Sequence, residues 1–240
     1  MQGQCLFLGT GSSTGTPVVG CVCPVCLSKD AHNRRLRPSA LLTIGDKKIL
    51  IDAGPDFRQQ ALQYKISHLD ALLLTHGHFD HTGGLDDLRI FYILEKKSVP
   101  CYLSKDTFHD LKKRFYYFFQ PIGKATTLSA QFNFQVLAET NGEFMIDGLR
   151  LQYFSYAQKE TRVIGFRLGD FAYLTDIRDF SPDIFTYLKN LRCLIVSTLR
   201  EGPSAVHFSL EESLAFAEKV KAKQTFFTHI SHEIDHAVCS

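Results

Sequence analysis

Four short apolar runs in this chain each end at side chains that can bind a metal ion or support one of its ligands. The runs and the residues that follow them are Lys48 to Ile51 with Asp52, Ala71 to Leu74 with Thr75 and His76, Phe171 to Leu174 with Thr175 and Asp176, and Thr225 to Phe227 with Thr228 and His229. Apolar runs of this length are typical of buried strands. Because strands of one sheet that run the same way end at one edge, we expect these polar side chains to lie together there.

The rest of the chain alternates between further apolar runs and segments with helical spacing. Strands are predicted at Cys5 to Leu8, Ala40 to Ile44 and Leu194 to Val196, and helices at Phe57 to Tyr64, Leu85 to Leu94, Thr107 to Phe119, Pro182 to Leu191 and Leu210 to Val220. Ser209 and Glu212 have the spacing of a capping box. Residues 132 to 168 are richer in alternating β pattern than in helix. No linker or repeat interrupts the chain, so we predict an α/β layered fold in a single domain of residues 1–240.

The densest cluster of candidate ligands is the run Thr75-His76-Gly77-His78-Phe79-Asp80-His81. In a turn after a strand, His76 and His78 can face one ion, and Asp80 and His81 can face a second. Two ions roughly 3.5–4 Å apart suit hydrolysis, because they clamp the attacking and leaving oxygens together. The plainer interpretation is a solvated histidine-rich loop, but the loop has glycines for tight turns and almost no other charge.

Composition excludes several classes of function. The chain has 27 Lys and Arg against 25 Asp and Glu, a formal net charge of +2, which is too small for a strong attraction to nucleic acid or an anionic membrane. Its apolar runs are far shorter than the roughly 20 residues that cross a bilayer. The N-terminal sequence has no signal-peptide pattern, and seven cysteines, an odd number, fit a reducing compartment. We therefore expect a cytoplasmic protein without a membrane partner.

Three of the cysteines, Cys21, Cys23 and Cys26, lie close together on a tight loop. Three thiolates at this spacing suit a closed tetrahedral zinc site, which needs one more sulfur or nitrogen ligand. The alternative is that the three thiols are reduced and bind no metal.

These motifs resemble those of a known superfamily. The HxHxDH run, Leu174-Thr175-Asp176 and Thr228-His229 are similar to the metallo-β-lactamase superfamily. The stretch GTGSSTGTP from Gly9 to Pro17, the cysteine run and Thr-His-Ile-Ser-His at 228 to 232 resemble the PhnP-type cyclic phosphodiesterases, relatives of the tRNA 3′-processing nucleases. The resemblance covers almost the whole chain, from Cys5 to His232.

The resemblance implies an αββα metallo-β-lactamase sandwich with two divalent metal ions, manganese or zinc, and one structural zinc. It makes His76 and His78 ligands of the first metal, makes Asp80, His81 and His229 ligands of the second, and makes Asp176 the bridge between them. It implies that Asp52 accepts a hydrogen bond from a ligand imidazole. It also implies that His207 contacts the substrate phosphate or protonates the leaving oxygen, and that His232 is the fourth ligand of the structural zinc.

One position departs from the family pattern. The family has a further histidine ligand of the first metal shortly before a strand that corresponds to Val163 to Arg167, and counting back places Gln158 there. A neutral amide oxygen is a poorer zinc ligand than imidazole and suits harder ions better. The outcomes are a weakened first site that still works, a one-metal enzyme or a degenerate site. If the count is off by one or two residues, Glu160 is the substitute ligand.

We therefore predict a metal-dependent phosphodiesterase in which His207, Asp80 and Asp176 are catalytic. The substrate is a small cyclic phosphodiester or a nucleotide, with a short RNA as an alternative. The alternative function is a catalytically degenerate, zinc-containing binding module. Arg34, Arg35 and Arg37 either grip a phosphate or form a solvated turn. The aromatic run Phe115 to Phe119 is core, a homodimer face or a stacking surface for a base.

Overall fold

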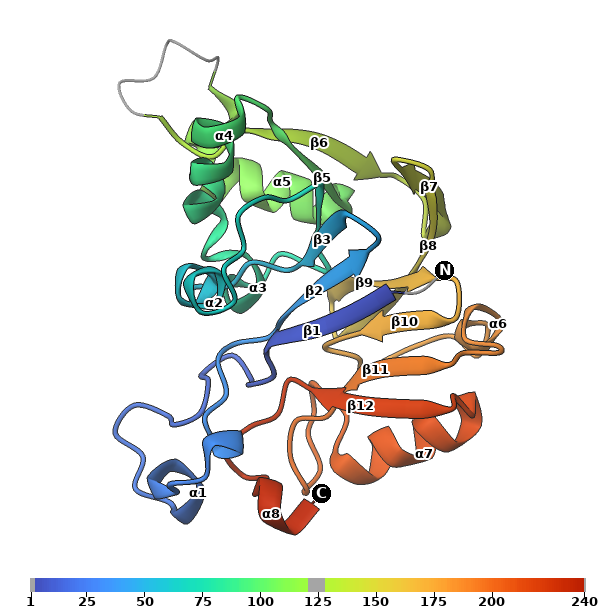
Figure 1. The fold of residues 1–240 in the computed structure, drawn as a ribbon. Coiled ribbons are helices and arrows are strands. Elements are labelled where there is room, and N and C mark those ends of the chain that lie inside the picture. The colour runs from blue at the N-terminus through green and yellow to red at the C-terminus, as the bar shows by residue number, and fades with distance from the viewer. Residues whose placement is uncertain (1–2, 121–127, 240) are drawn as a thin grey trace. The chain divides into compact units, whose positions relative to one another are not determined.

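The computed structural model describes residues 3–120 and 128–239, and the chain divides into two compact units (Figure 1). The first unit contains the described residues up to Leu8 and the segment Ser39–Ala138, and the second contains Gly9–Pro38 and the chain from Glu139 onward. Each unit has its own six-stranded sheet and its own hydrophobic core. The interpretation of residues 1–240 as one domain stays a prediction.

The sheet of the first unit has the strand order β1-β2-β3-β4-β5-β6. Its strands are β1 (Gly3–Gly9), β2 (Ser39–Ile44), β3 (Lys47–Ile51), β4 (Ala71–Leu73), β5 (Val99–Ser104) and β6 (Phe132–Leu137). Strands β2 and β3 form an antiparallel pair, and β3 to β6 run parallel. The helices are α2 (Phe57–Gln63), α3 (Phe79–Thr82), α4 (Arg89–Glu95) and α5 (Lys105–Arg114), with 3-10 turns at Leu85–Leu88 and Tyr116–Phe119.

The predicted aromatic run belongs largely to the core of the first unit. Helix α5 ends at Arg114, because the backbone of Phe115 leaves the helical conformation. The rings of Phe115 and Phe118 then stack with their centroids 5.1 Å apart, and Phe118 is buried. Tyr116 differs from the others in being 64% exposed. Of the three interpretations of this run, the core is the one its packing supports.

The sheet of the second unit has the strand order β12-β11-β10-β9-β8-β7. Its strands are β7 (Asn141–Ile146), β8 (Leu149–Gln158), β9 (Thr161–Leu168), β10 (Phe171–Leu174), β11 (Cys193–Ser197) and β12 (Gln224–Thr228). Strands β7 to β10 form an antiparallel meander, and β10, β11 and β12 run parallel. The helices are α1 (Pro24–Leu27), α6 (Ile184–Tyr187), α7 (Leu210–Val220) and α8 (His236–Cys239), with a 3-10 turn at Ala31–Asn33.

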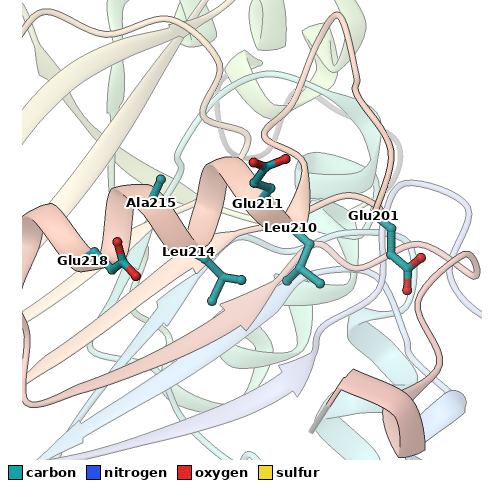
Figure 2. Close-up of a pocket in the computed structure, with 6 residues that line it drawn as sticks. All are labelled: Glu201, Leu210, Glu211, Leu214, Ala215 and Glu218. Carbon is teal, nitrogen blue, oxygen red and sulfur yellow. The ribbon is translucent and has the colours of Figure 1, made fainter.

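Helix α7 forms as its sequence predicts. Ser209 Oγ accepts a hydrogen bond from the backbone N–H of Glu212 at 3.2 Å, and Glu212 Oε2 accepts one from the backbone N–H of Ser209 at 2.8 Å. This is the predicted capping box. Side chains three and four residues apart, among them Phe216 and Val220, are buried against the sheet. Another side of α7 carries an open hollow that contains no predicted site residue and is lined by Glu201, Leu210, Glu211, Leu214, Ala215 and Glu218 (Figure 2).

Besides the helix predicted at Thr107 to Phe119, which ends at Arg114, the structure differs from the sequence predictions in the following places. Strand β5 was not among the predicted strands, because Pro100 interrupts its pattern. The predicted helix at Pro182 to Leu191 shortens to the four residues of α6. The four strands that end in candidate ligands do not share one sheet: β3 and β4 belong to the first unit, and β10 and β12 to the second. Within the described part of the chain, no helix has the length and apolar character to cross a membrane.

Candidate metal centre

Three of the four strand ends turn the backbone sharply. Asp52, Asp176 and His229 have φ angles of 60°, 54° and 60°, in the left-handed region that few residues other than glycine adopt. Such backbone conformations concentrate at functional sites, where the surrounding structure must hold them in place. The strand endings were predicted from the sequence, but the left-handed turns were not, because a positive φ is uncommon for any single non-glycine residue, even for Asp and His, which are enriched there.

In the first unit, the Asp52 carboxylate binds both ends of the loop that carries the histidines. Asp52 Oδ1 accepts a hydrogen bond from the backbone N–H of Thr75 at 2.8 Å, and Oδ2 accepts one from the Thr75 hydroxyl at 2.8 Å. Oδ2 also lies 2.7 Å from Nδ1 of His81. Burial raises the pKa of Asp52, while the His81 ring and these donors act in the opposite direction. Three donors on one carboxyl group favour its ionised form.

These contacts determine which nitrogen of each ring carries the proton. An ionised Asp52 can only accept, so His81 donates from Nδ1. The single hydroxyl proton of Thr75 is given to Asp52, so Thr75 Oγ1 accepts from Nδ1 of His76 at 3.0 Å. Both rings therefore keep the lone pair of Nε2 for an ion, which is the usual arrangement of a metal-binding histidine.

The first unit brings its predicted ligands together. The His76 ring centroid lies 4.5 Å from that of His78 and 4.2 Å from that of His81. Asp80 Oδ2 lies 3.4 Å from Nε2 of His81, on the short helix α3. The Thr82 hydroxyl donates to the carbonyl of His78 at 2.8 Å and so holds the loop against α3. Imidazoles and a carboxylate in this arrangement are a donor set that suits a divalent metal ion.

In the second unit, His207 and His229 lie close to the carboxylate of Asp176. Asp176 Oδ1 lies 3.2 Å from Nε2 of His229 and 3.6 Å from Nδ1 of His207. The hydroxyl of Thr175 donates to Asp176 Oδ2 at 2.6 Å. The candidate ligand atoms of these three residues all lie within 4.8 Å of one another, which also makes a donor set for a divalent ion. The family resemblance implies that His207 contacts the substrate, and His207 was not among the predicted metal ligands.

Gln158 lies at the end of β8, beside the same carboxylate. Its Nε2 donates to Asp176 Oδ1 at 3.4 Å and lies 2.8 Å from Nε2 of His207. Its buried Oε1 has no hydrogen-bond partner among residues 3–120 and 128–239. Of the residues that Gln158 was expected to neighbour, Asp176 is therefore in contact with it, and the role of Gln158 as a ligand stays a prediction. The alternative, Glu160, is exposed in the turn after β8.

Cys21, Cys23, Cys26 and His232 form a separate cluster within the second unit. The three Sγ atoms lie 3.4, 3.4 and 3.5 Å from Nδ1 of His232. With Zn–S bonds of about 2.3 Å and a Zn–N bond of about 2.05 Å, a tetrahedral site has its sulfur and nitrogen atoms about 3.6 Å apart. The four residues predicted to bind a structural zinc thus have the spacing that this ion requires.

The thiols of this cluster differ in acidity. The backbone N–H of Cys26 and then the His232 ring lower the pKa of Cys23 to about 6, whereas burial raises the pKa of Cys26 to about 11. Cys23 therefore loses its proton more readily than Cys26, and Cys26 must lose its proton when a metal binds.

Arg35 holds the loop that carries His232. Its buried guanidinium donates to the carbonyls of Ser231 at 3.1 Å and Ile234 at 3.0 Å, and to Asn33 Oδ1 at 2.9 Å. The hypothesis that Arg35 grips a phosphate is wrong, because its donors are used inside the unit. The sequence gives little sign that Arg35 is buried, because buried and exposed arginines have no distinguishing local pattern.

The glycine-rich stretch allows backbones to approach closely. The backbone N–H of Gly11 donates to the carbonyl of Leu36 at 2.8 Å, and a Cβ atom at Gly11 would lie 2.6 Å from the carbonyl oxygen of Arg35. The neighbouring Ser12 donates from its backbone N–H to Ile230, the residue after His229. The stretch thus supports a candidate ligand through the backbone.

Comparisons with known proteins identify the family and the fold of this chain. A model of the β-lactamase superfamily domain matches residues 47–230. The crystal structure of a diphosphatase from the PhnP family is 37% identical, with a TM-score of 0.90 over 99% of this chain and 90% of that one. The short form of human tRNase Z, 16% identical with a TM-score of 0.71 over 96% of this chain and 93% of that one, shares the fold.

A curated relative from Porphyromonas gingivalis, named octanoyltransferase, is 36% identical over 95% of this chain. The chain spans about half the length of that relative, 46%, so the relative's name describes a longer protein.

The fold and these donor sets define the class of the metal-dependent hydrolases with a metallo-β-lactamase fold, which hold divalent ions such as zinc. The chain belongs to the β-lactamase superfamily and, within it, to the PhnP family. The fold predicted from the sequence motifs is confirmed.

Proposed function

We propose that this chain is a metal-dependent phosphodiesterase that acts on a small phosphodiester, cyclic or linear, or on a nucleotide. Two divalent ions, when bound, supply a hydroxide at neutral pH and neutralise the charge that develops on the phosphate. The observation that carries the proposal is the role of Asp52, which orients His76 and His81 so that both present Nε2. A histidine-rich loop without such a function needs no shared carboxylate beneath it.

In this proposal the loop of the first unit supplies His76, His78, Asp80 and His81, and the second unit supplies Asp176 and His229. The inference that both sets bind the same pair of ions, with Asp176 as the bridge, rests on the family resemblance. Thr175 holds one oxygen of Asp176 through its hydroxyl, so that Oδ1 remains directed at His229. The fully buried Asp52 keeps its hydrogen bonds free from competition by water.

The family supports the proposed substrate class. The PhnP-family relative is a diphosphatase, which supports cleavage of a phosphorus–oxygen bond in a small substrate. The net charge of +2 provides little general attraction for a long polyanion, so a short RNA remains the less favoured substrate. The activity of the longer Porphyromonas protein is not assigned to this chain.

The second candidate is a zinc-containing binding module with a degenerate active site. The observation that favours it is Gln158, whose amide stands next to Asp176 where the family pattern has an imidazole. Such a module would retain the zinc at Cys21, Cys23, Cys26 and His232 and bind a phosphorylated ligand without turnover.

Hydrolysis of bis(p-nitrophenyl) phosphate and of inorganic pyrophosphate, measured with added Mn²⁺ or Zn²⁺, separates the two candidates. We expect turnover that Asp80→Ala abolishes, while Asp106→Ala, which changes an exposed carboxylate on α5, leaves it intact. Absence of turnover with every metal would reject the enzyme and support the binding module.

A further inference from the structure

We propose that His207 is a metal ligand that binds one ion together with Asp176 and His229, and that it makes up for the imidazole this chain lacks at position 158. This assignment differs from the family resemblance, which gives position 158 to the first metal and His229 to the second. This inference rests on the proposed function, in which an ion binds at Asp176. It replaces the expectation from the family resemblance that His207 protonates the leaving oxygen.

The distances around Asp176 suit such a site. Ligand atoms about 2.1 Å from one ion lie about 3.0–3.4 Å apart at octahedral and tetrahedral angles. Asp176 Oδ1 lies 3.2 Å from Nε2 of His229 and 3.6 Å from Nδ1 of His207. The two histidine rings stack with centroids 4.6 Å apart and an angle of 28°. A set of two histidines and one carboxylate, held on one side of an ion, is a common metal-binding arrangement.

The backbone around His207 is held in place beside Asp176. The backbone N–H of Phe208 donates to the carbonyl of Ile177 at 3.1 Å, so the residues that follow His207 and Asp176 are directly hydrogen-bonded. Arg178 donates to the carbonyl of His207 at 3.2 Å and to both carboxylate oxygens of Glu212, at 2.8 and 2.9 Å. The imidazole is thus presented from a fixed backbone, as a metal ligand requires.

Gln158 provides the partner that a ligating imidazole needs for its other nitrogen. Metal-binding histidines usually donate their second N–H to an oxygen. Nε2 of the Gln158 amide lies 2.8 Å from Nε2 of His207. Rotating the amide group by 180° places Oε1 at that position instead. With an ion on Nδ1, the ring proton is on Nε2 and Oε1 accepts it. Oε1 is also the atom of Gln158 that lacks a hydrogen-bond partner within the described segments.

The contacts of His207 and Gln158 favour the ligand role over the other two roles. A general acid directs an N–H at the leaving oxygen, whereas Nδ1 of His207 lies 3.6 Å from Asp176 Oδ1 and its Nε2 lies 2.8 Å from Gln158 Nε2. Gln158 as the ligand would offer a neutral amide oxygen where an imidazole is already within reach. Gln158 is therefore a positioning residue for His207.

The test is a calorimetric titration with Mn²⁺ of protein stripped of weakly bound metal, in which the structural zinc is retained. Thiolates select zinc over manganese, so the titration reports the imidazole and carboxylate sites. We expect His207→Ala to weaken one Mn²⁺ site by more than about 100-fold. The double variant Gln158→His with His207→Ala should restore binding to within about 10-fold, because position 158 then supplies the imidazole. His109→Ala, on the exposed side of α5, is the matched control.

Unchanged Mn²⁺ affinity in His207→Ala, together with a fall in kcat, would overturn the inference and leave the proposed function standing. A loss of Mn²⁺ binding in Gln158→Ala but not in His207→Ala would also overturn it, because the amide would then be the ligand. If the unaltered protein binds neither Mn²⁺ nor Zn²⁺ beyond the structural zinc, the proposed function fails with it. Retention of that zinc and an unchanged thermal midpoint in His207→Ala show that the variant folds.

Discussion

His81 donates from Nδ1 to Oδ2 of Asp52 across 2.7 Å, and the same oxygen receives the hydroxyl proton of Thr75, which in turn accepts from His76. One buried carboxylate therefore determines the proton position on two rings of the histidine loop. This relationship lies entirely within the first unit.

Replacing Asp52 with Asn should weaken metal binding without removing a ligand. An amide presents one oxygen and one NH₂ group, so it cannot accept from His81 and both Thr75 donors in the same way. We expect affinity for Mn²⁺ to fall about 10- to 100-fold, as for other residues that orient metal ligands. Isothermal titration measures this, with Asp106→Asn as the control. Equal affinities for the two variants would show that Asp52 does not orient the rings.

The cysteine cluster should hold one zinc that is independent of the other ions. Cys26→Ser removes one of four ligands, and we expect the zinc content measured by mass spectrometry to fall by about one ion per chain. Cys239→Ser, which changes an exposed thiol, should leave the zinc content unchanged. The thermal midpoint of Cys26→Ser should fall as well, because a bound ion would join the loop of residues 21–26 to His232. Zinc content equal to that of the unaltered protein would reject this site.

Arg35→Met should destabilise the second unit. The substitution leaves the Ser231 and Ile234 carbonyls and Asn33 Oδ1 without the donor they have now. Hydrogen bonds to charged groups contribute about 1.5–3 kcal/mol each, and the cost of a buried unsatisfied group is similar, so we expect a loss of at least about 3 kcal/mol. Denaturant unfolding measures it, with the exposed Arg34→Met as control. A loss no greater than that of Arg34→Met would contradict the assignment.

The ion pair at the start of α7 predicts a pH dependence of stability. Burial opposes ionisation of Glu212, but the backbone N–H of Ser209 and the Arg178 side chain outweigh it and lower the pKa of Glu212 below its ordinary value of 4.5. A carboxyl group with a lowered pKa stabilises the folded state above its ordinary pKa, and the contribution disappears as the pH falls through the lowered value.

Glu212→Gln tests this dependence, because glutamine keeps the capping geometry without the charge. The Glu212 side chain is 40% exposed, so solvent screening limits the expected difference at pH 7 to roughly 0.5–1 kcal/mol. Thermal unfolding of both proteins should show a gap at pH 7 that narrows below pH 4.5. A gap that is the same at both pH values would show that the charge of Glu212 contributes nothing.

The sequence was sufficient to predict most elements that carry candidate ligands. Strands β3, β4, β10 and β12 were recognisable because each is a short apolar run whose end is marked by the first polar residue. Strand β12, at the edge of its sheet, is only partly buried. Helix α7 was recognisable because its cap and its buried face both follow local rules. Strand β5 was not predicted from the sequence, because Pro100 weakens its β pattern. Its position in the sheet is set by pairing with its parallel neighbours β4 and β6.

What the chain determines by itself is the chemistry available: imidazoles, carboxylates and thiols at the ends of strands and in tight loops, where residue type and spacing are local properties. Only the tertiary structure decided that these strand ends are divided between two sheets, that Asp52 serves two rings, that Arg35 is buried and that Gln158 lies between Asp176 and His207. The reason is that a hydrogen bond between residues distant in sequence depends on strand register and on side-chain torsions. Both are set by packing of the whole unit, and no local pattern records them.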